Sequence, residues 1–407
     1  MTSESTGVAP AVSARRVYLL LCGSLAAQSL GQSAMFAVLP SLGREVGLLE
    51  IQVGAIIAAS SVVFFFAGPF WGRASDRIGR RKVFLLGQLG YVIGGSLFAA
   101  SFWLALEGVI APMFAWFCMI AARMTQATLM SASQPAAGAY IADITGAGSR
   151  AKGLARLGAA NNLGSIAGPA IGGLLATVSL LAPFGLAVLS VAIGGLLAYR
   201  YLPSIPARAM DGVRPKVKFT DRRVLSWVIA GTAMFMGAAV VQQTLSFRIQ
   251  DALQLDAGAA AGAFGTTMMA SALAGLLAQT VLVQRIRLSP AGWLALGLPL
   301  IAVALVMMAA FASLSMFIAA NVLMGFGMGF AGAGFTAGAS LAVTAEEQGA
   351  VAGVTAACSS AGWIVGPLLG PGLYRVVPAL PFLLTAGIVA AVSVFVVVSM
   401  RTSMSSR

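Results

Sequence analysis

The feature that most constrains this chain is a series of long apolar runs, each able to cross a membrane as one helix. About 20 mostly apolar residues span a hydrocarbon core of about 30 Å. Such runs form two sets of six, separated by a polar break. They lie at 17–39, 51–71, 83–106, 110–142, 154–178, 183–202, 224–247, 259–283, 291–311, 315–341, 350–372 and 379–400. The sequence therefore predicts an all-α integral membrane protein with twelve transmembrane helices.

The composition excludes several classes of protein. Only 9% of the residues are charged, whereas soluble globular proteins carry about 25%. Histidine is absent, and the three cysteines, Cys22, Cys118 and Cys358, all lie in apolar runs. No histidine catalyst, Cys/His metal site or disulfide framework can be built from this set. We therefore expect no enzymatic activity, no metal and no cofactor.

The basic residues predict how the chain is oriented. A net charge of +13 would also fit nucleic-acid binding. However, lysine and arginine gather in both tails and in alternate loops, and only Arg44, Arg248 and Arg375 fall in the remaining loops. Cytoplasmic loops of membrane proteins carry this excess of positive charge. We expect a multi-pass protein of the cell membrane, with both termini cytoplasmic, a bacterial inner membrane as its site and no nucleic-acid partner.

The polar break divides the chain into two similar parts. We expect a cytoplasmic tail at 1–16, a six-helix bundle at 17–202, a cytoplasmic linker at 203–223, a second six-helix bundle at 224–400 and a tail at 401–407. Gly168-Pro169 and Gly366-Pro367 each lie in the fifth run of their half. Two parallel repeats are typical of secondary transporters, whose site lies at the repeat interface. We expect a monomer that works in the lipid bilayer on a small-molecule substrate.

A charged motif follows the second run. It reads Gly72-Arg-Ala-Ser-Asp76-Arg77-Ile-Gly79-Arg80-Arg81, and it places one carboxylate among several cations beside helix ends. An ordinary cytoplasmic loop could carry the same cations. The stretch resembles the signature of the major facilitator superfamily, although Ala74 replaces the usual leucine. This resemblance implies a conformational latch between the halves, formed by Asp76, Arg77 and Arg81.

A second motif lies in the fifth run, in which Gly164, Gly168 and Gly172 are spaced to form a small-residue stripe. Such stripes allow close packing of membrane helices, and Pro169 would kink the helix. Any tightly packed membrane helix could show the glycine spacing alone. The whole pattern, including Gly173, resembles the antiporter signature of the drug:proton branch of that superfamily, which includes tetracycline-type exporters. The resemblance implies export driven by a proton gradient.

The first helix departs from that branch. Tetracycline-type exporters carry an acid twelve positions before a Leu-Pro at the helix end, and Gln28 occupies this position here, before Leu39-Pro40. Gln28 and Gln32 share a helix face, and they could equally serve to bond neighbouring helices. No carboxylate falls clearly in the middle of a run. Only Glu107, between the third and fourth runs, remains a candidate for titration during transport.

Arg123 falls near the middle of the fourth run, where a charge is costly and indicates a functional site. A structural role, bonded to amides and backbone carbonyls, is the alternative. The residue resembles the arginine of the superfamily's fourth helix, which is linked to proton movement. Gln134 continues its helix face, and the resembled fold would add Gln242 and Asn321 from the seventh and tenth helices to the cavity.

These observations predict a secondary active transporter that exports a small organic molecule by alternating access. Proton-coupled efflux of drugs or antibiotics, as in multidrug resistance, is the leading interpretation. Export of an anionic metabolite such as a carboxylate siderophore is an alternative, because Arg123 has no evident acidic partner. A membrane receptor that kept the fold but lost transport is a more remote alternative.

Overall fold

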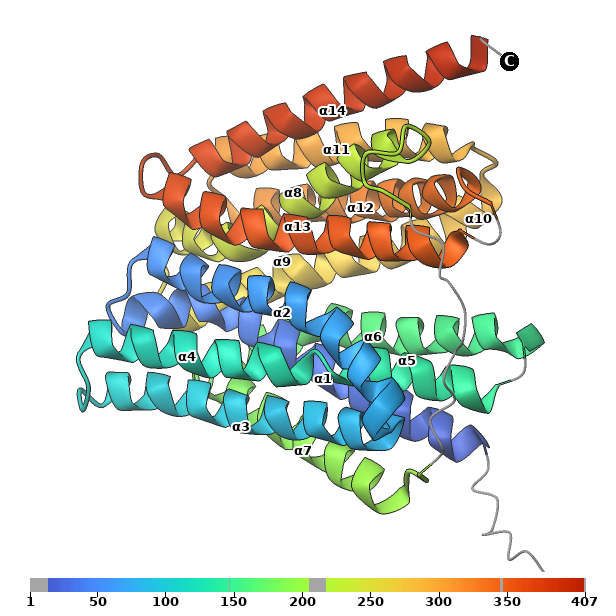
Figure 1. Cartoon of the computed structure of the whole chain (residues 1–407). Coiled ribbons are helices and arrows are strands. Elements are labelled where there is room, and N and C mark those ends of the chain that lie inside the picture. Colours follow the sequence, from blue (N-terminus) through green and yellow to red (C-terminus); the bar gives the residue numbers. More distant parts are fainter. Residues whose placement is uncertain (1–13, 146, 205–216, 345–346, 406–407) are drawn as a thin grey trace, which may run out of the picture.

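The computed structural model describes residues 14–145, 147–204, 217–344 and 347–405 (Figure 1). All regular elements within these ranges are helices. The first half contains α1 (Ala14–Glu45), α2 (Glu50–Ile78), α3 (Arg80–Leu106), α4 (Pro112–Met130), α5 (Ser133–Ile144), α6 (Ala147–Ala176) and α7 (Ala182–Tyr201). The second half contains α8 (Leu225–Leu253), α9 (Ala257–Leu277), the π-helical turn η1 (Ala278–Leu282), α10 (Val283–Arg285), α11 (Pro290–Ala310), α12 (Leu314–Leu341), α13 (Gln348–Tyr374) and α14 (Leu380–Ser405).

The fold class predicted from the sequence is confirmed. The described elements form twelve long helical segments when α4 and α5 are counted as one segment and α9, η1 and α10 are counted as another. Eight of the described helices are long and apolar enough to cross a membrane on their own. Large apolar side chains such as Phe66, Leu174 and Val178 are 70% or more exposed, as expected of a surface that faces lipid.

The helices lie in two bundles (Figure 1). α1 to α7 form the lower bundle in the figure, and α8 to α14 form the upper one. We call the left side of the figure, where α1 ends, the Arg44 end, and the right side, where α7 ends and α8 begins, the linker end.

Several helices exceed their predicted limits: α1 continues through Pro40 to Glu45, and α2 continues to Ile78. Polar side chains at these helix ends explain why the apolar runs underestimate the helices. The predicted linker falls partly on 205–216, outside the described residues.

Turn residues explain where neighbouring helices separate. Gly47, Gly79 and Gly108 have positive φ angles of 77°, 97° and 68°, which glycine adopts without a steric penalty. Each of these glycines lies in a short connection between consecutive helices. Asp256 and Ser289 cap α9 and α11, because their side chains accept hydrogen bonds from the backbone N–H groups of Ala259 and Gly292, the third residue of each helix.

The glycines of the fifth run bring α6 against α1. Gly164, Gly168 and Gly172 lie against the α1 backbone. A Cβ atom at Gly172 would lie 2.5 Å from the carbonyl oxygen of Ala34, so no side chain fits without moving a helix. Small residues are what permits such close approach in a membrane, where lipid tails remove most of the hydrophobic driving force between helices.

The second half repeats this packing at equivalent positions. Gly362, Gly366 and Gly370 of α13 lie against α8. The same two glycine-bearing helices also bring the halves together near the Arg44 end. A Cβ at Gly173 of α6 would lie 2.7 Å from the carbonyl oxygen of Ala261 on α9, and Gly54 of α2 meets the Pro367 carbonyl of α13. The internal symmetry seen in the sequence is therefore a symmetry of helix contacts.

Replacing Gly168 by alanine should destabilise the fold, because a Cβ there would meet Ser33 and the α1 backbone. Overpacking of this kind costs about 1–3 kcal/mol, and the thermal unfolding midpoint of the purified protein should fall. Gly158→Ala on the same helix is the matched control, because a Cβ at Gly158 meets no atom within 4 Å. Equal midpoints for the two variants would contradict this account of the stripe.

Candidate functional site

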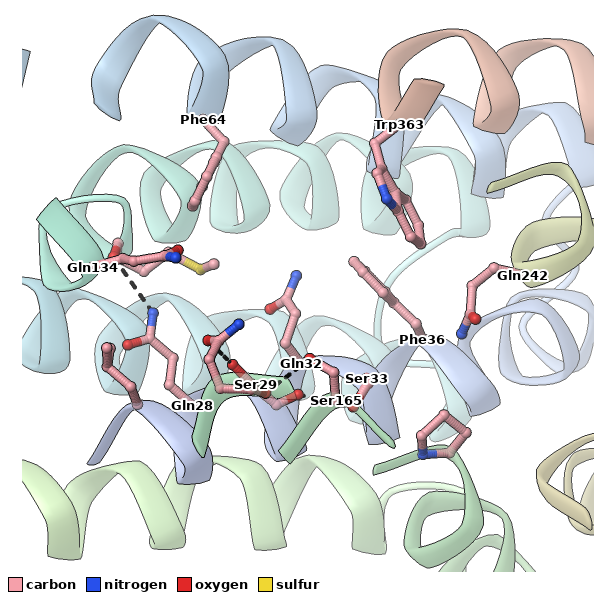
Figure 2. Close-up of a pocket in the computed structure, with 14 residues that line it drawn as sticks. Gln28, Ser29, Gln32, Ser33, Phe36, Phe64, Gln134, Ser165, Gln242 and Trp363 are labelled. Carbon is pink, nitrogen blue, oxygen red and sulfur yellow. Dashed lines mark hydrogen bonds between the residues drawn. The ribbon is translucent and has the colours of Figure 1, made fainter. Parts of the chain in front are cut away.

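Two adjoining cavities of about 290 and 240 Å³ lie between the bundles. Side chains from α1, α2, α4, α5 and α6 line them on one side, and side chains from α8 and α13 on the other. Figure 2 shows side chains from both halves turned towards the same space. The residues common to both cavities are Gln32, Phe36, Phe64, Met130 and Trp363. This is the repeat-interface position at which the sequence predicts a substrate site.

Arg123 of α4 forms part of the cavity wall and is only 2% exposed. Its Nη1 donates hydrogen bonds to the side-chain oxygens of Gln126 and Gln32. The guanidinium carbon lies 5.5 Å from the ring centres of both Phe36 and Phe98, within the range of cation–π attraction. Arg123 is thus held by neutral amides and aromatic faces, and it makes no ion pair with the described residues.

The amides of α1 form a polar strip along the cavity. Gln28 donates to the backbone oxygen of Met130 at 3.4 Å and accepts from Gln88 at 3.1 Å. Gln32 accepts from Arg123 at 3.4 Å. Gln28 and Gln32 therefore combine the two roles considered for them, because both residues line the cavity and both bond to neighbouring helices. Gln28, which stands where tetracycline-type exporters carry an acid, is therefore held by hydrogen bonds at both its amide nitrogen and its amide oxygen.

Aromatic rings narrow the cavity where the halves meet. The rings of Phe36 on α1 and Trp363 on α13 stack with centres 6.0 Å apart. Phe64 of α2 lines both cavities as well. Since Phe36 also contacts the Arg123 guanidinium, one aromatic ring connects the buried charge of the first half to the indole of the second.

Beyond these rings, a cluster of charged and aromatic side chains joins the halves. We name it the Arg44 cluster: Arg44, Glu50, Phe247, Asp251 and Tyr374. Arg44 pairs with Glu50 at 2.8 Å and with Asp251 of the other half at 2.6 Å. Tyr374 donates to Asp251 at 2.6 Å, and the Arg44 guanidinium lies 4.7 Å from the Phe247 ring centre. Partly exposed pairs contribute little singly, so closure here depends on the network.

The described ion pairs at the linker end lie within one half. Arg80 is buried and bridges Asp76 and Asp143, all in the first half. Arg81 donates to the backbone of Tyr199, and Arg77 is exposed. The latch role predicted for Asp76, Arg77 and Arg81, with Gly72 and Gly79 in the same motif, would need contacts between the halves. It stays a prediction for another state of the protein.

The second half has its own pair at the linker end. Arg223, before α8, bonds to Glu347 at the start of α13 at 2.9 Å. The hydrogen bonds from Arg223 lower the pKa of the Glu347 carboxyl to about 2. A lowered pKa means that this pair contributes fully above the ordinary value of 4.5 and is lost only as the pH falls towards 2.

The remaining predicted residues are not all in the cavity. Gln134 and Gln242 line it. Asn321 is fully buried in α12 but lines neither cavity, and it donates to the backbone oxygen of Phe317. Glu107 is exposed in the turn after α3. Within the described part of the chain, no group of acidic or cysteine side chains is placed to hold a metal ion.

The sequence did not single out three features of the site. Phe36 gave no signal, because phenylalanine is common in apolar helices. Ser61 and Ser359 line the Arg123 cavity from opposite halves, and nothing in their spacing indicates this. The pairing of Arg44 with Asp251 could have been suspected only because both charges fall on the same predicted side of the membrane.

The sequence profile of the Major Facilitator Superfamily matches residues 21–367. The chain belongs to this superfamily. Its members are transporters rather than enzymes, in agreement with the sequence prediction.

Individual relatives match over part of their length. The class C tetracycline resistance protein of Escherichia coli is 32% identical over 171 residues, which are 41% of this chain and 39% of that protein. Multidrug resistance protein 2 of Bacillus subtilis is 29% identical over 170 residues, which are 42% of this chain and 40% of that one. These matches therefore span about two fifths of the relatives.

Solved structures share the whole fold at low identity. The human organic anion transporter MFSD10 (TETRAN) aligns with a TM-score of 0.65 and 20% identity, over 94% of this chain and 99% of that one. A POT family transporter aligns with a TM-score of 0.74 and 11% identity, over 96% and 99% of the two chains. At these identities the likeness shows the fold alone.

The Arg44 end should be closed in the resting protein, and a cross-link can test this. The hydroxyls of Ser41 and Ser246, from α1 and α8, lie 3.1 Å apart at this end. In a variant lacking the native cysteines, Ser41→Cys with Ser246→Cys should form a disulfide upon mild oxidation. Adding Asp251→Asn should lower the cross-linked fraction severalfold, because it weakens the Arg44 cluster.

Asp256→Asn is the control for this measurement. Asp256 lies at the same end but caps α9 and makes no ion pair with the described residues. It should leave cross-linking unchanged. A cysteine pair that fails to cross-link, or that responds equally to both substitutions, would contradict the assigned closure.

The low pKa of Glu347 leads to a prediction about pH. Between pH 5 and 8 the carboxylate stays ionised and paired with Arg223, so it neither gains nor loses a proton. Glu347→Gln should therefore leave the pH profile of substrate flux unchanged in this range, whatever it does to the rate. A profile whose midpoint moves in the variant would show that Glu347 titrates during transport.

Proposed function

We propose that this protein exports a small organic molecule from the cell by alternating access, as a proton-coupled antiporter. The observation that carries the proposal is a cavity shared by both halves and closed at one end by contacts between them. The ion pairs that join the halves, Arg44–Asp251 and Arg375–Glu50, lie at the Arg44 end. The described ion pairs of the linker end stay within each half.

The distribution of basic residues supports an orientation for this state. If the cytoplasmic segments carry most of the lysine and arginine, the linker end faces the cytoplasm and the Arg44 end faces outward. The cavity then takes its substrate from the cytoplasm. Transport requires the Arg44 cluster to separate while the linker end closes, a two-state change of the kind that rocking halves undergo.

Export rather than import is supported by the glycine pattern of α6. Gly168 and Pro169 belong to the stretch that resembles the antiporter signature, and Pro169 lines the cavity while Gly173 packs on the opposite half. One helix thus connects the cavity to the contact that must open. The named relatives are resistance proteins for tetracycline and for multiple drugs, which favours drug-like molecules as substrates and a proton gradient as the energy source.

Transport can be measured in everted membrane vesicles with an acidic interior. Tetracycline, ethidium and 2-naphthoate serve as probes of three charge types. A probe that binds the purified protein should accumulate in the vesicles and should dissipate part of the pH gradient. A protonophore should abolish the accumulation.

The cross-linkable variant supplies a control within the same protein. Vesicles with the Ser41→Cys/Ser246→Cys protein should transport when reduced, stop when oxidised and recover on reduction, because a disulfide prevents the Arg44 end from opening. A probe that binds but never accumulates, even in the reduced protein, would reject transport and favour a receptor.

A further inference from the structure

The charge of the cavity is set by one residue. Arg123 contributes a positive charge, and the described residues that line the two cavities include no aspartate or glutamate. A buried charge usually requires an opposite charge or a full set of hydrogen bonds. Arg123 has neither: it makes no ion pair with the described residues, and its Nε–H finds no hydrogen-bond partner among them. The cavity wall at Arg123 is therefore electropositive.

Several polar side chains in the two adjoining cavities are also without partners. The side chains of Gln134 and Gln242, which line the larger cavity, make no hydrogen bond to other described residues, and neither do the side chains of Ser61 and Ser359 at the Arg123 cavity. Gln242 and Ser359 come from the second half. Polar groups that converge on an apolar cavity without internal partners are what a ligand site requires. All four are neutral, so they leave the positive charge of Arg123 uncompensated.

The apolar part of the wall has a definite shape. Phe36 and Trp363 stack face to face, with an angle of 23° between their planes, and Phe64 also lines both cavities. Aromatic rings attract a further planar group in an offset or edge-to-face arrangement. Phe36 is also the ring over which the Arg123 guanidinium lies, so the flat wall and the charge are adjacent.

We propose that the cavity binds an organic anion, with its carboxylate at Arg123 and a planar apolar group against Phe36, Trp363 and Phe64. The unpartnered amides and hydroxyls from both halves would hold polar substituents. This inference rests on the proposed transport function and names its substrate class. It also means that a lipophilic cation meets an uncompensated positive charge on entry, with no carboxylate in the described cavity wall to offset it.

Three probes with one ring system separate the effect of charge from that of shape. They are 2-naphthoate, the neutral 2-naphthamide and the cationic 2-naphthyltrimethylammonium. Binding is measured by equilibrium dialysis against the purified protein in lipid nanodiscs at pH 7. Naphthoate should bind at least about tenfold more tightly than naphthamide, the ratio that corresponds to about 1.4 kcal/mol. The cation should bind most weakly.

The variant Arg123→Gln should remove this preference. It should bind naphthoate and naphthamide within about twofold of each other, with naphthamide affinity close to that of the unmodified protein. Arg123→Lys keeps the charge and should retain part of the preference, which provides a test if the glutamine variant does not fold. Arg248→Gln is the matched control: it removes an arginine outside both cavities and should leave all three affinities unchanged.

The outcomes separate this inference from the proposed function. Tightest binding of the cation, or an anion preference that survives in Arg123→Gln, would overturn the assigned substrate class while leaving transport intact. An Arg123-dependent preference for naphthoate in a protein that fails the vesicle test would support the site and reject transport. Equal affinities for all three probes in the unmodified protein would also overturn the inference.

Discussion

Within a bilayer the backbone has no water to bond with, and this constraint determines most of the architecture. Each segment must satisfy its own N–H and C=O groups, so each crossing is a helix. Helices in lipid then gain little from burying apolar surface and depend instead on close contact. The glycine stripes of α6 and α13 provide that contact, and they place the α1 and α8 backbones at the centre of the molecule. The cavity lies between these two central helices, which supply Gln32 and Gln242.

The same constraint explains how the halves can separate. Their contact at the Arg44 end combines backbone approaches, such as Gly173 to Ala261, with a polar network around Arg44. Apolar side chains of both halves, such as Leu42 of α1 and Leu245 of α8, also belong to one buried cluster and add to this contact. Partly exposed ion pairs are individually weak, and their charged groups can separate and bond to water instead at modest cost. Closure by many small contributions suits a transporter, whose two states must differ little in free energy.

Much of this architecture could be predicted from the sequence, because the length of an apolar run and the charge of a loop depend only on residues that are adjacent in the chain. The twelve crossings, the two halves and the close-packing role of Gly168 all follow from such patterns. The cavity was predictable only in part. Helical spacing predicts that Gln28 and Gln32 share one face and that Gln134 continues the face of Arg123, and the structure places all four in the walls of the two adjoining cavities.

The position of a residue could not be predicted from the sequence where the rotation of its helix, or a contact between distant segments, decides that position. Asn321 has the polarity of a cavity residue, but α12 turns it into the packed interior, where it bonds to its own helix. Glu107 lies beyond the last turn of α3 and is exposed. Arg44 and Asp251 are 207 residues apart, and no local pattern links them. Such pairs become visible only when the bundles are assembled.

The buried arginine remains the residue whose energetics demand a partner. Amide oxygens and two aromatic faces lower the cost of burying Arg123, but they do not neutralise it. The partner of Arg123 on α1 is the neutral Gln32, and Gln28 bonds instead to Met130 and Gln88. Arg123 is already only 2% exposed in this state, so the cost of its uncompensated charge is present before any substrate binds. A bound anion of the proposed kind would offset this cost by placing a negative charge beside the guanidinium.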